Sequence, residues 1–480
     1  MSDNLKQQTK KGLYWKFAEQ FSNYGIQFII GIVMARLLSP SDYGITALPA
    51  VFMAISSIFI SGGFGDALIR KPDLKEEDLS TMFYYSLIVG CLLYIILFSL
   101  SPFIAEFYDV PILESLMRVA ALSFLWYPLG TPQYVILHRR LDFKTPTKIG
   151  IVCKILTGII GITLAYTGFG LWALVVSPMV GDIIGIFMNW YVVRWLPRRK
   201  WSNKSFKYLW EYGNRIMASY MLNTIYENIT PILIGKFFTT ADLGHYNRAK
   251  GYAGMASVNV TGTIQSVTFP VISRIQSDDE KLRMVYRRML QTTAFVIFPI
   301  MVLLSAIAHP LVIVMITDKW VPCVVLLQIM CYSMMWYPIH ALNLNLLMVK
   351  GRTDLFFRLE VIKKIWGLLI LILSLPHGII VLCCGNVISS LGSLIINTYY
   401  TGKLINLGFV QQMKDFFHIL VLCLIMFSIV YFVNTYIYDN LLKIIIGSSL
   451  GILIYIGGAV IFNFSELKDV MYMLNPKKQQ

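Results

Sequence analysis

Two stretches, ARLLSPSDYG at residues 35–44 and GKFFTTADLG at residues 235–244, resemble each other across 200 positions. In each, a cation is followed by two large apolar residues, a hydroxyl residue, an aspartate and a glycine. A second pair, SFLWYPL at residues 123–129 and SMMWYPI at residues 333–339, is 210 positions apart. Similarity at a nearly constant offset indicates that the chain contains two copies of one structural unit. Chance similarity between apolar segments is the alternative explanation.

Long apolar blocks contain both copies. Of the 480 residues, 56% are apolar and 14% are charged, against roughly 25% charged in soluble domains. Blocks of about 20 apolar residues have the length that an α-helix needs to cross the hydrocarbon core. This composition excludes a disordered chain, a disulfide scaffold and an ordinary cytosolic enzyme. We predict an all-α polytopic membrane protein with about fourteen transmembrane helices, at residues 13–38, 43–64, 81–101, 114–136, 147–167, 171–193, 209–236, 243–271, 289–316, 321–347, 361–375, 378–400, 417–437 and 441–463.

The positions of Lys and Arg predict the orientation of these helices. With the N-terminus placed in the cytoplasm, 31 of the 41 Lys and Arg residues fall in inside segments, and the outside loops hold one, Lys319. Cytoplasmic loops of membrane proteins are enriched in these residues. Both termini are therefore predicted to be cytoplasmic. The net charge of +15 follows from this topology, so nucleic acid is not an expected partner.

The matched stretches are always six helices apart. Because six is an even number, the two copies have the same orientation, which indicates a parallel repeat about an axis along the membrane normal. We predict two six-helix lobes, at residues 1–208 and 209–402, followed by two extra helices and a cytoplasmic tail at residues 403–480. Transporters built from repeats hold their substrate where the repeats meet.

Polar residues recur at helical spacing inside several predicted spans. A charge at the bilayer centre costs about 2.5–3.5 kcal/mol on insertion scales, so it usually faces a cavity or a partner. The offset of 200 superposes Asn23 on Asn223 and Gln27 on Glu227, which predicts that both polar stripes face the seam between the lobes. The candidate substrate-binding residues are Lys16, Asn23 and Gln27 on the first helix, Arg215 and Asn223 on the seventh, and Arg248, Tyr252 and Asn259 on the eighth.

Three carboxylates inside the predicted spans, Glu19, Asp182 and Glu227, are candidates to bind a coupling proton or Na⁺. Each polar group also has a simpler interpretation. Lys16 and Arg215 lie within a few turns of the inside surface and could extend to it. Glu19 could pair with Lys16 three residues earlier, and Asp182 could hold neighbouring helices together.

Motifs for catalysis, metal binding or cofactor binding are absent from the sequence. It has no P-loop, no HExxH and no membrane-edge DxD, and its seven cysteines form no CxxC pair. We therefore predict no enzyme activity, no metal and no cofactor. His309 and His340 are single histidines of the kind that usually pack or lie at an edge.

Four motifs occur in a characteristic order: ARLLSPSDYG at 35–44, PFIAEFYDVP at 102–111, RRLDFK at 139–144 and GFGLWALV at 168–175. The set resembles the polysaccharide-transport branch of the multidrug/oligosaccharidyl-lipid/polysaccharide exporter superfamily, of the colanic-acid and teichuronic-acid type. This resemblance implies two six-helix bundles around a central cavity, and two extra helices. It also implies that an undecaprenyl-diphosphate-linked oligosaccharide is flipped across the bacterial inner membrane, by alternating access, for lipopolysaccharide, capsule or exopolysaccharide synthesis. The lipid bilayer, a polysaccharide polymerase and a chain-length regulator are then expected partners.

Two other functions remain open from the sequence. A small-molecule or drug cation antiporter of the same superfamily would share the architecture, although the basic residues of the seam disfavour a cationic substrate. A membrane polysaccharide polymerase or glycosyltransferase would need a sizeable outside loop or paired outside carboxylates, and the outside segments carry only scattered acids.

Overall fold

The computed structural model describes residues 22, 24–198 and 200–474, and in this part of the chain helices are joined by short loops, with no strand. Ten of its segments are long and apolar enough to cross a membrane, and a shorter apolar helix spans Tyr24–Leu37. These findings confirm an all-α polytopic membrane protein. The count of fourteen spans and the cytoplasmic position of the termini stay predictions.

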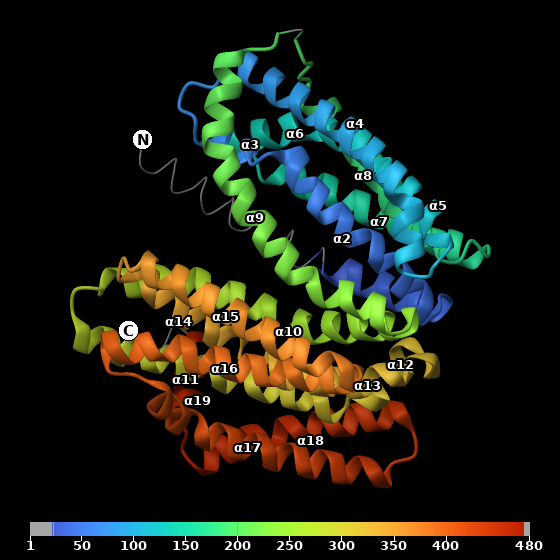
Figure 1. The fold of residues 1–480 in the computed structure, drawn as a ribbon. Coiled ribbons are helices and arrows are strands. Elements are labelled where there is room, and N and C mark those ends of the chain that lie inside the picture. The colour runs from blue at the N-terminus through green and yellow to red at the C-terminus, as the bar shows by residue number, and fades with distance from the viewer. Residues whose placement is uncertain (1–21, 23, 199, 475–480) are drawn as a thin grey trace. The chain divides into compact units, whose positions relative to one another are not determined.

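Contacts divide the chain into two compact units, residues 1–244 and 245–480, and each is described by itself (Figure 1). The helices of the first unit are α2 (Pro40–Ser61), α3 (Phe64–Arg70), α4 (Glu76–Phe107), α5 (Ile112–Ala121), α6 (Ser123–Arg139), α7 (Lys144–Tyr166), α8 (Trp172–Val193) and α9 (Asn203–Phe237). α10 (Thr240–Arg274) begins in the first unit and continues into the second. The second unit also holds α11 (Asp279–Ala306), α12 (Ala308–Ile316), α13 (Pro322–Met334), α14 (Tyr337–Val349), α15 (Thr353–Ser374), α16 (Ile379–Ile405), α17 (Phe409–Tyr436), α18 (Asn440–Ile461) and α19 (Ser465–Leu474), with short 3-10 helices at Asp318–Trp320 and Leu375–His377.

Several predicted spans are broken into two helices. The predicted span at 43–64 ends at the turn between α2 and α3, where Gly62 and Gly63 have φ of 58° and 68°. Glycine adopts this left-handed conformation without steric cost. The predicted spans at 289–316 and 321–347 are also interrupted, at Ile307 and at residues 335–336. The short helix α19 was not predicted from the sequence, because it is too short to give a membrane-spanning apolar block.

The duplicated stretch folds into the same helix cap in both copies. At the start of α2, the Ser39 hydroxyl donates to Asp42 Oδ2 at 2.7 Å and accepts from the Asp42 N–H at 3.2 Å. At the start of α10, the Thr239 hydroxyl makes the equivalent bonds to Asp242, at 2.7 and 3.1 Å. A hydroxyl residue followed three positions later by an acid satisfies backbone N–H groups that the first helical turn leaves unpaired. The repeated cap agrees with a duplicated structural unit.

The first turns of α2 and α10 cross at two glycines. A Cβ atom on Gly44 would lie 1.6 Å from the Thr240 carbonyl oxygen, and one on Gly244 would lie 2.0 Å from the Pro40 carbonyl oxygen. Because Pro40 and Thr240, like Gly44 and Gly244, are 200 residues apart, the contact is symmetric under the repeat. Only glycine permits two backbones to approach so closely.

α9 packs entirely within the first unit, along α2, α3 and α4 (Figure 1). Its Leu209 joins a buried apolar cluster with Phe64 and Leu68 of α3 and Val135 of α6. The lobes predicted at residues 1–208, 209–402 and 403–480 were defined by the repeat and not by packing, and they stay a prediction.

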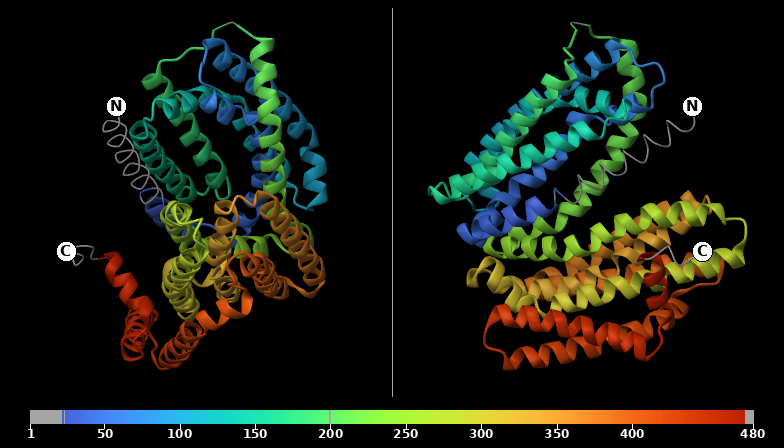
Figure 2. Two further views of the ribbon diagram at one scale, coloured as in Figure 1. Left: turned by 90° about the vertical axis from the view of Figure 1, so that its left-hand side faces the viewer. Right: turned by 180° about the vertical axis from the view of Figure 1, so that it is seen from behind.

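α17 and α18 lie side by side as a hairpin in the second unit (Figure 2). Charged residues fasten α17 and the short helix α19 to α11. Arg287 of α11 pairs with Asp415 of α17, and the adjacent Arg288 pairs with Asp469 of α19. Both carboxylates are buried. Removing one partner of a buried pair leaves an uncompensated charge, so these two arginines fix α17 and α19 against α11.

We predict that Gly44→Ala and Gly244→Ala each destabilise the protein, because the added Cβ displaces a backbone carbonyl. Overpacking of this kind costs about 1–3 kcal/mol or more, which should lower the midpoint of thermal unfolding of the purified chain in detergent. Gly254→Ala on α10 is the matched control, since a Cβ there meets no atom within 4 Å. An unchanged midpoint in all three variants would contradict the close backbone contact between α2 and α10.

Candidate functional site

A stripe of polar side chains on α9 is left uncovered by the first unit. Arg215, Ser219, Asn223 and Glu227 follow one another at four-residue spacing, and all four are exposed. Leu209 and Ile234, by contrast, are fully buried against the unit. Gln27, on the Tyr24–Leu37 helix of the same unit, is exposed too. These side chains are therefore available to water or to a ligand.

Three predicted site residues, Lys16, Glu19 and Asn23, lie outside the described residues. Their positions on the first helix stay predictions.

A small pocket in the first unit contains Asp182. The pocket has a volume of about 150 Å³. Asp182 lies midway along α8, and the ammonium group of Lys154, on α7, interacts electrostatically with it. Ser57 and Ser123 also line the pocket. The remaining lining residues are mostly apolar: Met53, Phe124, Trp126, Tyr127 and Ile186. One carboxylate with hydroxyl neighbours can bind a proton or a small cation within an otherwise apolar span.

In the second unit, aromatic rings hold the predicted Arg248. Its guanidinium carbon lies 5.6 Å from the ring centre of Tyr252, one turn later on α10, and 5.2 Å from that of Trp320. A guanidinium over an aromatic face gains a cation–π interaction of about 0.5–2 kcal/mol. The structure thus brings Arg248 and Tyr252 together, and their role in substrate binding stays a prediction. Asn259, the third predicted residue on α10, makes a hydrogen bond within its own helix: its amide nitrogen donates to the Met255 carbonyl at 2.8 Å.

Sequence reasoning did not predict the part played by Trp320. Trp320 is fully buried, and it contacts both Arg248 and the ring of His245, at 5.6 Å between ring centres. Nothing in its spacing could have shown this, because it belongs to the 3-10 helix Asp318–Trp320, far from α10 in sequence.

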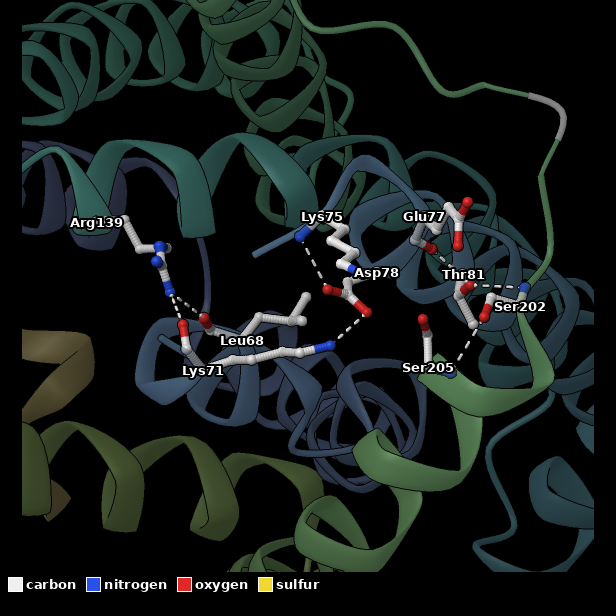
Figure 3. A network of polar contacts seen from close by, with 9 residues as sticks. All are labelled: Leu68, Lys71, Lys75, Glu77, Asp78, Thr81, Arg139, Ser202 and Ser205. Atoms are coloured by element: carbon white, nitrogen blue, oxygen red, sulfur yellow. Dashed lines mark hydrogen bonds and ion pairs between the residues drawn. The ribbon is translucent and has the colours of Figure 1, made fainter. Parts of the chain in front are cut away.

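A polar network organises the loop between α3 and α4 (Figure 3). Arg139, the last residue of α6, donates to the carbonyl oxygens of Leu68 and Pro72 at 2.9 Å each, and also to that of Lys71. Lys71 Nζ in turn lies 2.7 Å from Asp78 of α4. The four carbonyl contacts of Arg139, which include one to Ile69, hold the C-terminal end of α3 in place.

The second unit repeats this arrangement with a lysine. Lys350 follows α14 and donates to the Gln276 carbonyl at 2.7 Å, in the loop after α10. It also pairs with Asp279 of α11. Arg139 and Lys350 are 211 residues apart, close to the offset of the SFLWYPL repeat, so a cation at the same place fastens the corresponding loop in each unit. Because one residue is an arginine and the other a lysine, the sequence comparison did not match these two positions.

Comparison with known proteins places the chain in a family. The model of the polysaccharide biosynthesis protein family matches residues 33–325, more than half of the chain. The chain belongs to this family. Teichuronic acid biosynthesis protein TuaB of Bacillus subtilis (strain 168) is 26% identical over 357 residues, which cover 74% of each chain. Lipopolysaccharide biosynthesis protein WzxC of Escherichia coli (strain K12) is 22% identical, with 75% of this chain and 74% of that protein covered.

Solved transporter structures share the fold of this family member. The lipid II flippase MurJ, in an inward closed conformation, has a TM-score of 0.75 at 19% identity, covering 96% of this chain and all of MurJ. An inward-facing multidrug resistance MATE family transporter has a TM-score of 0.55 at 15% identity, covering 80% of this chain and 95% of that one. The family match and the relatives confirm the predicted resemblance to polysaccharide exporters.

We predict that cysteines placed in the α9 stripe are accessible from water. In a cysteine-free background, Asn223→Cys and Glu227→Cys should react with a membrane-impermeant thiol reagent in inverted membrane vesicles. Ile95→Cys on α4 is the control, because Ile95 is exposed among apolar neighbours and should face acyl chains. Equal reactivity at all three positions would refute a hydrophilic surface on α9.

Proposed function

We propose that this protein flips a lipid-linked oligosaccharide across the cytoplasmic membrane of a bacterium for surface polysaccharide synthesis. The observation that carries the proposal is the exposed polar stripe of α9, at Arg215, Asn223 and Glu227, within a chain of apolar spans. Family membership supports it, as do relatives named for teichuronic acid and lipopolysaccharide biosynthesis. A further relative is the succinoglycan biosynthesis transport protein ExoT of Rhizobium meliloti (strain 1021), 23% identical over 64% of this chain and 62% of that protein.

Such a substrate needs a protein because its headgroup is strongly polar. A diphosphate and several sugars cannot cross about 30 Å of hydrocarbon unaided, since burying a polar group without partners costs several kcal/mol. Polar side chains such as those of the α9 stripe would replace the lost water. The polyprenyl chain could remain in the bilayer while the headgroup passes.

The proposed roles follow from side-chain chemistry. Arg215 and Arg248 supply fixed positive charge for a diphosphate, and an arginine can bind two phosphate oxygens at once. Lys16 would add a third cation. The amides and hydroxyl of Asn23, Gln27, Asn223, Tyr252 and Asn259 are donors and acceptors suited to sugar hydroxyls.

Coupling to an ion gradient is proposed for the carboxylates. Asp182 has the most defined surroundings, in a pocket that two serines also line and with Lys154 nearby. Glu227 and Glu19 are the other candidates. Alternating exposure of the polar stripes to the two sides of the membrane would then move the headgroup.

For Arg248→Ala and Glu227→Ala we predict normal protein levels and impaired translocation. In a strain lacking the gene, neither variant should restore surface polysaccharide, and the lipid-linked unit should accumulate inside the cell. Arg248→Lys is the matched control and should restore part of the activity, because it keeps the charge but loses the planar, two-pronged donor group.

Two outcomes would contradict the proposed function. A deletion strain with unaltered surface polymer and no accumulated lipid-linked unit would show that the protein does not supply this pathway. Uptake of cationic dyes by proteoliposomes, without movement of lipid-linked sugar, would instead favour a drug antiporter.

Asp182→Asn tests the proposed coupling site. The amide keeps the shape of the side chain but cannot bind a proton or balance the charge of a cation. We expect this variant to fold normally, with transport in vesicles that no longer responds to an imposed proton or Na⁺ gradient. Ser123→Ala in the same pocket is the control and should leave the gradient response largely intact. A full response in Asp182→Asn would remove Asp182 from coupling.

A further inference from the structure

Three helices of the first unit bring an acid and two tyrosines together, none of which was a predicted site residue. Asp66 lies on α3, Tyr134 on α6 and Tyr220 on α9. The Tyr220 hydroxyl donates to Asp66 Oδ2 at 3.3 Å. The Asp66 carboxylate also interacts electrostatically with the Tyr134 hydroxyl. We name Asp66, Tyr134 and Tyr220 the acid–tyrosine cluster.

The backbone around the cluster is held in place by close packing. A Cβ atom on Gly213 of α9 would lie 2.3 Å from the Gly62 carbonyl oxygen, so α9 touches the turn that begins α3. Tyr220 follows Gly213 by two helical turns. At the other end of α3, Arg139 holds the Leu68 carbonyl. Since Phe64 and Leu68 are fully buried, α3 cannot turn, and Asp66 is fixed on its outward face.

The backbone that carries the cluster is packed against the first unit, but the three side chains of the cluster are exposed. Tyr134 is 52% exposed and Tyr220 is 49% exposed, and Asp66 is exposed as well. Within the described part of the chain, Asp66 Oδ2 accepts from Tyr220 and Oδ1 has no donor. On α6, Tyr127 lies two turns before Tyr134 and is 44% exposed, and the centre of the His138 ring lies 3.9 Å from that of the Tyr134 ring.

An acyl-chain environment does not suit this surface. A carboxylate facing hydrocarbon is costly, and the Asp66 carboxylate has no ion pair with a cation of the described residues to offset that cost. A belt of tyrosines at the membrane surface would not require an acid shared between two of them. The cluster therefore faces water or a polar ligand.

We propose that the acid–tyrosine cluster binds sugar rings of the transported glycan. A pyranose ring has an apolar C–H face and a rim of hydroxyl groups. Exposed tyrosine rings offer large, rigid, amphipathic surfaces on which the apolar C–H face can pack. A carboxylate with an available oxygen accepts charge-assisted hydrogen bonds from the hydroxyl groups. The cluster is acidic and aromatic, so it suits uncharged sugar hydroxyls and not the diphosphate, which the arginines would bind.

This inference rests on the proposed function and assigns the glycan end of the substrate to α3, α6 and α9. By the predicted orientation, Arg70 at the end of α3 and Lys71 directly after it are cytoplasmic, which would put the cluster in the cytoplasmic half of the protein. It would then contact the headgroup as the headgroup enters.

Photo-crosslinking in living cells tests the proposal with the substrate of the host itself. The full-length chain carries p-benzoylphenylalanine in place of Tyr134 or Tyr220 and is expressed in the deletion strain fed radiolabelled glucose. After irradiation, we expect acid-labile radiolabel to be attached covalently to the purified chain at both positions. Tyr191 of α8, which is 77% exposed, is the matched control position and should acquire little label.

A second variant separates binding from folding. Adding Asp66→Asn to the chain that carries the crosslinker at position 134 should lower the radiolabel about tenfold, as expected for loss of a hydrogen bond to a charged group. The midpoint of thermal unfolding should stay unchanged, because Asp66 is exposed.

The results distinguish this inference from the proposed function. Equal label at positions 134, 220 and 191, or full label with Asp66→Asn, overturns the sugar-binding cluster. Absence of label at every position also overturns it, and leaves the transport proposal standing if the deletion strain accumulates the lipid-linked unit. Normal polymer in the deletion strain overturns both.

Discussion

Hydrocarbon offers no hydrogen-bonding partner, and this constraint governs where polar side chains lie in the protein. Some of those inside the helical units are paired with one another. In the second unit, the amides of Asn343 and Gln412 bond to each other at 3.1 and 3.2 Å, and the Thr401 hydroxyl donates to Asn343 at 2.9 Å. Nearby, the His340 ring lies 3.2 Å from the Ser390 hydroxyl, so it is a packed and bonded residue. The stripe of α9 differs from these residues in its exposure, because Arg215, Ser219, Asn223 and Glu227 are all exposed along one helix.

The duplicated elements fix the positions of helices next to this stripe. Identical caps begin α2 and α10, and Gly44 and Gly244 let their first turns cross. A cation at the end of α6 or after α14, Arg139 or Lys350, holds the neighbouring loop in each unit. α17 and α19 are fastened differently, by buried acids paired with two arginines of α11. Rigid caps and ion pairs thus lie at helix ends, while the polar stripe runs along the length of one helix.

Much of the fold follows from the sequence because it depends on local patterns. Apolar length predicts the spans, and the hydroxyl–acid spacing at Ser39 and Thr239 predicts the caps. The candidate site depends partly on such patterns. Arg248 and Tyr252 are one turn apart on one helix, so their contact could be predicted. Trp320 and Asp66 could not, because tertiary packing brings them to Arg248 and Tyr220 from distant parts of the chain. The breaks at Ile307 and at residues 335–336 were also missed, since neither carries a glycine signal.

Reconstituted transport tests the central claim most directly. Lipid-linked glycan extracted from the host is incorporated into the inner leaflet of vesicles, and its arrival in the outer leaflet is followed with an impermeant glycosidase. Vesicles that contain the protein should expose the glycan much faster than protein-free vesicles, and a variant with apolar residues at Arg215, Asn223 and Glu227 should not. Exposure at the same rate with and without the protein would contradict the account.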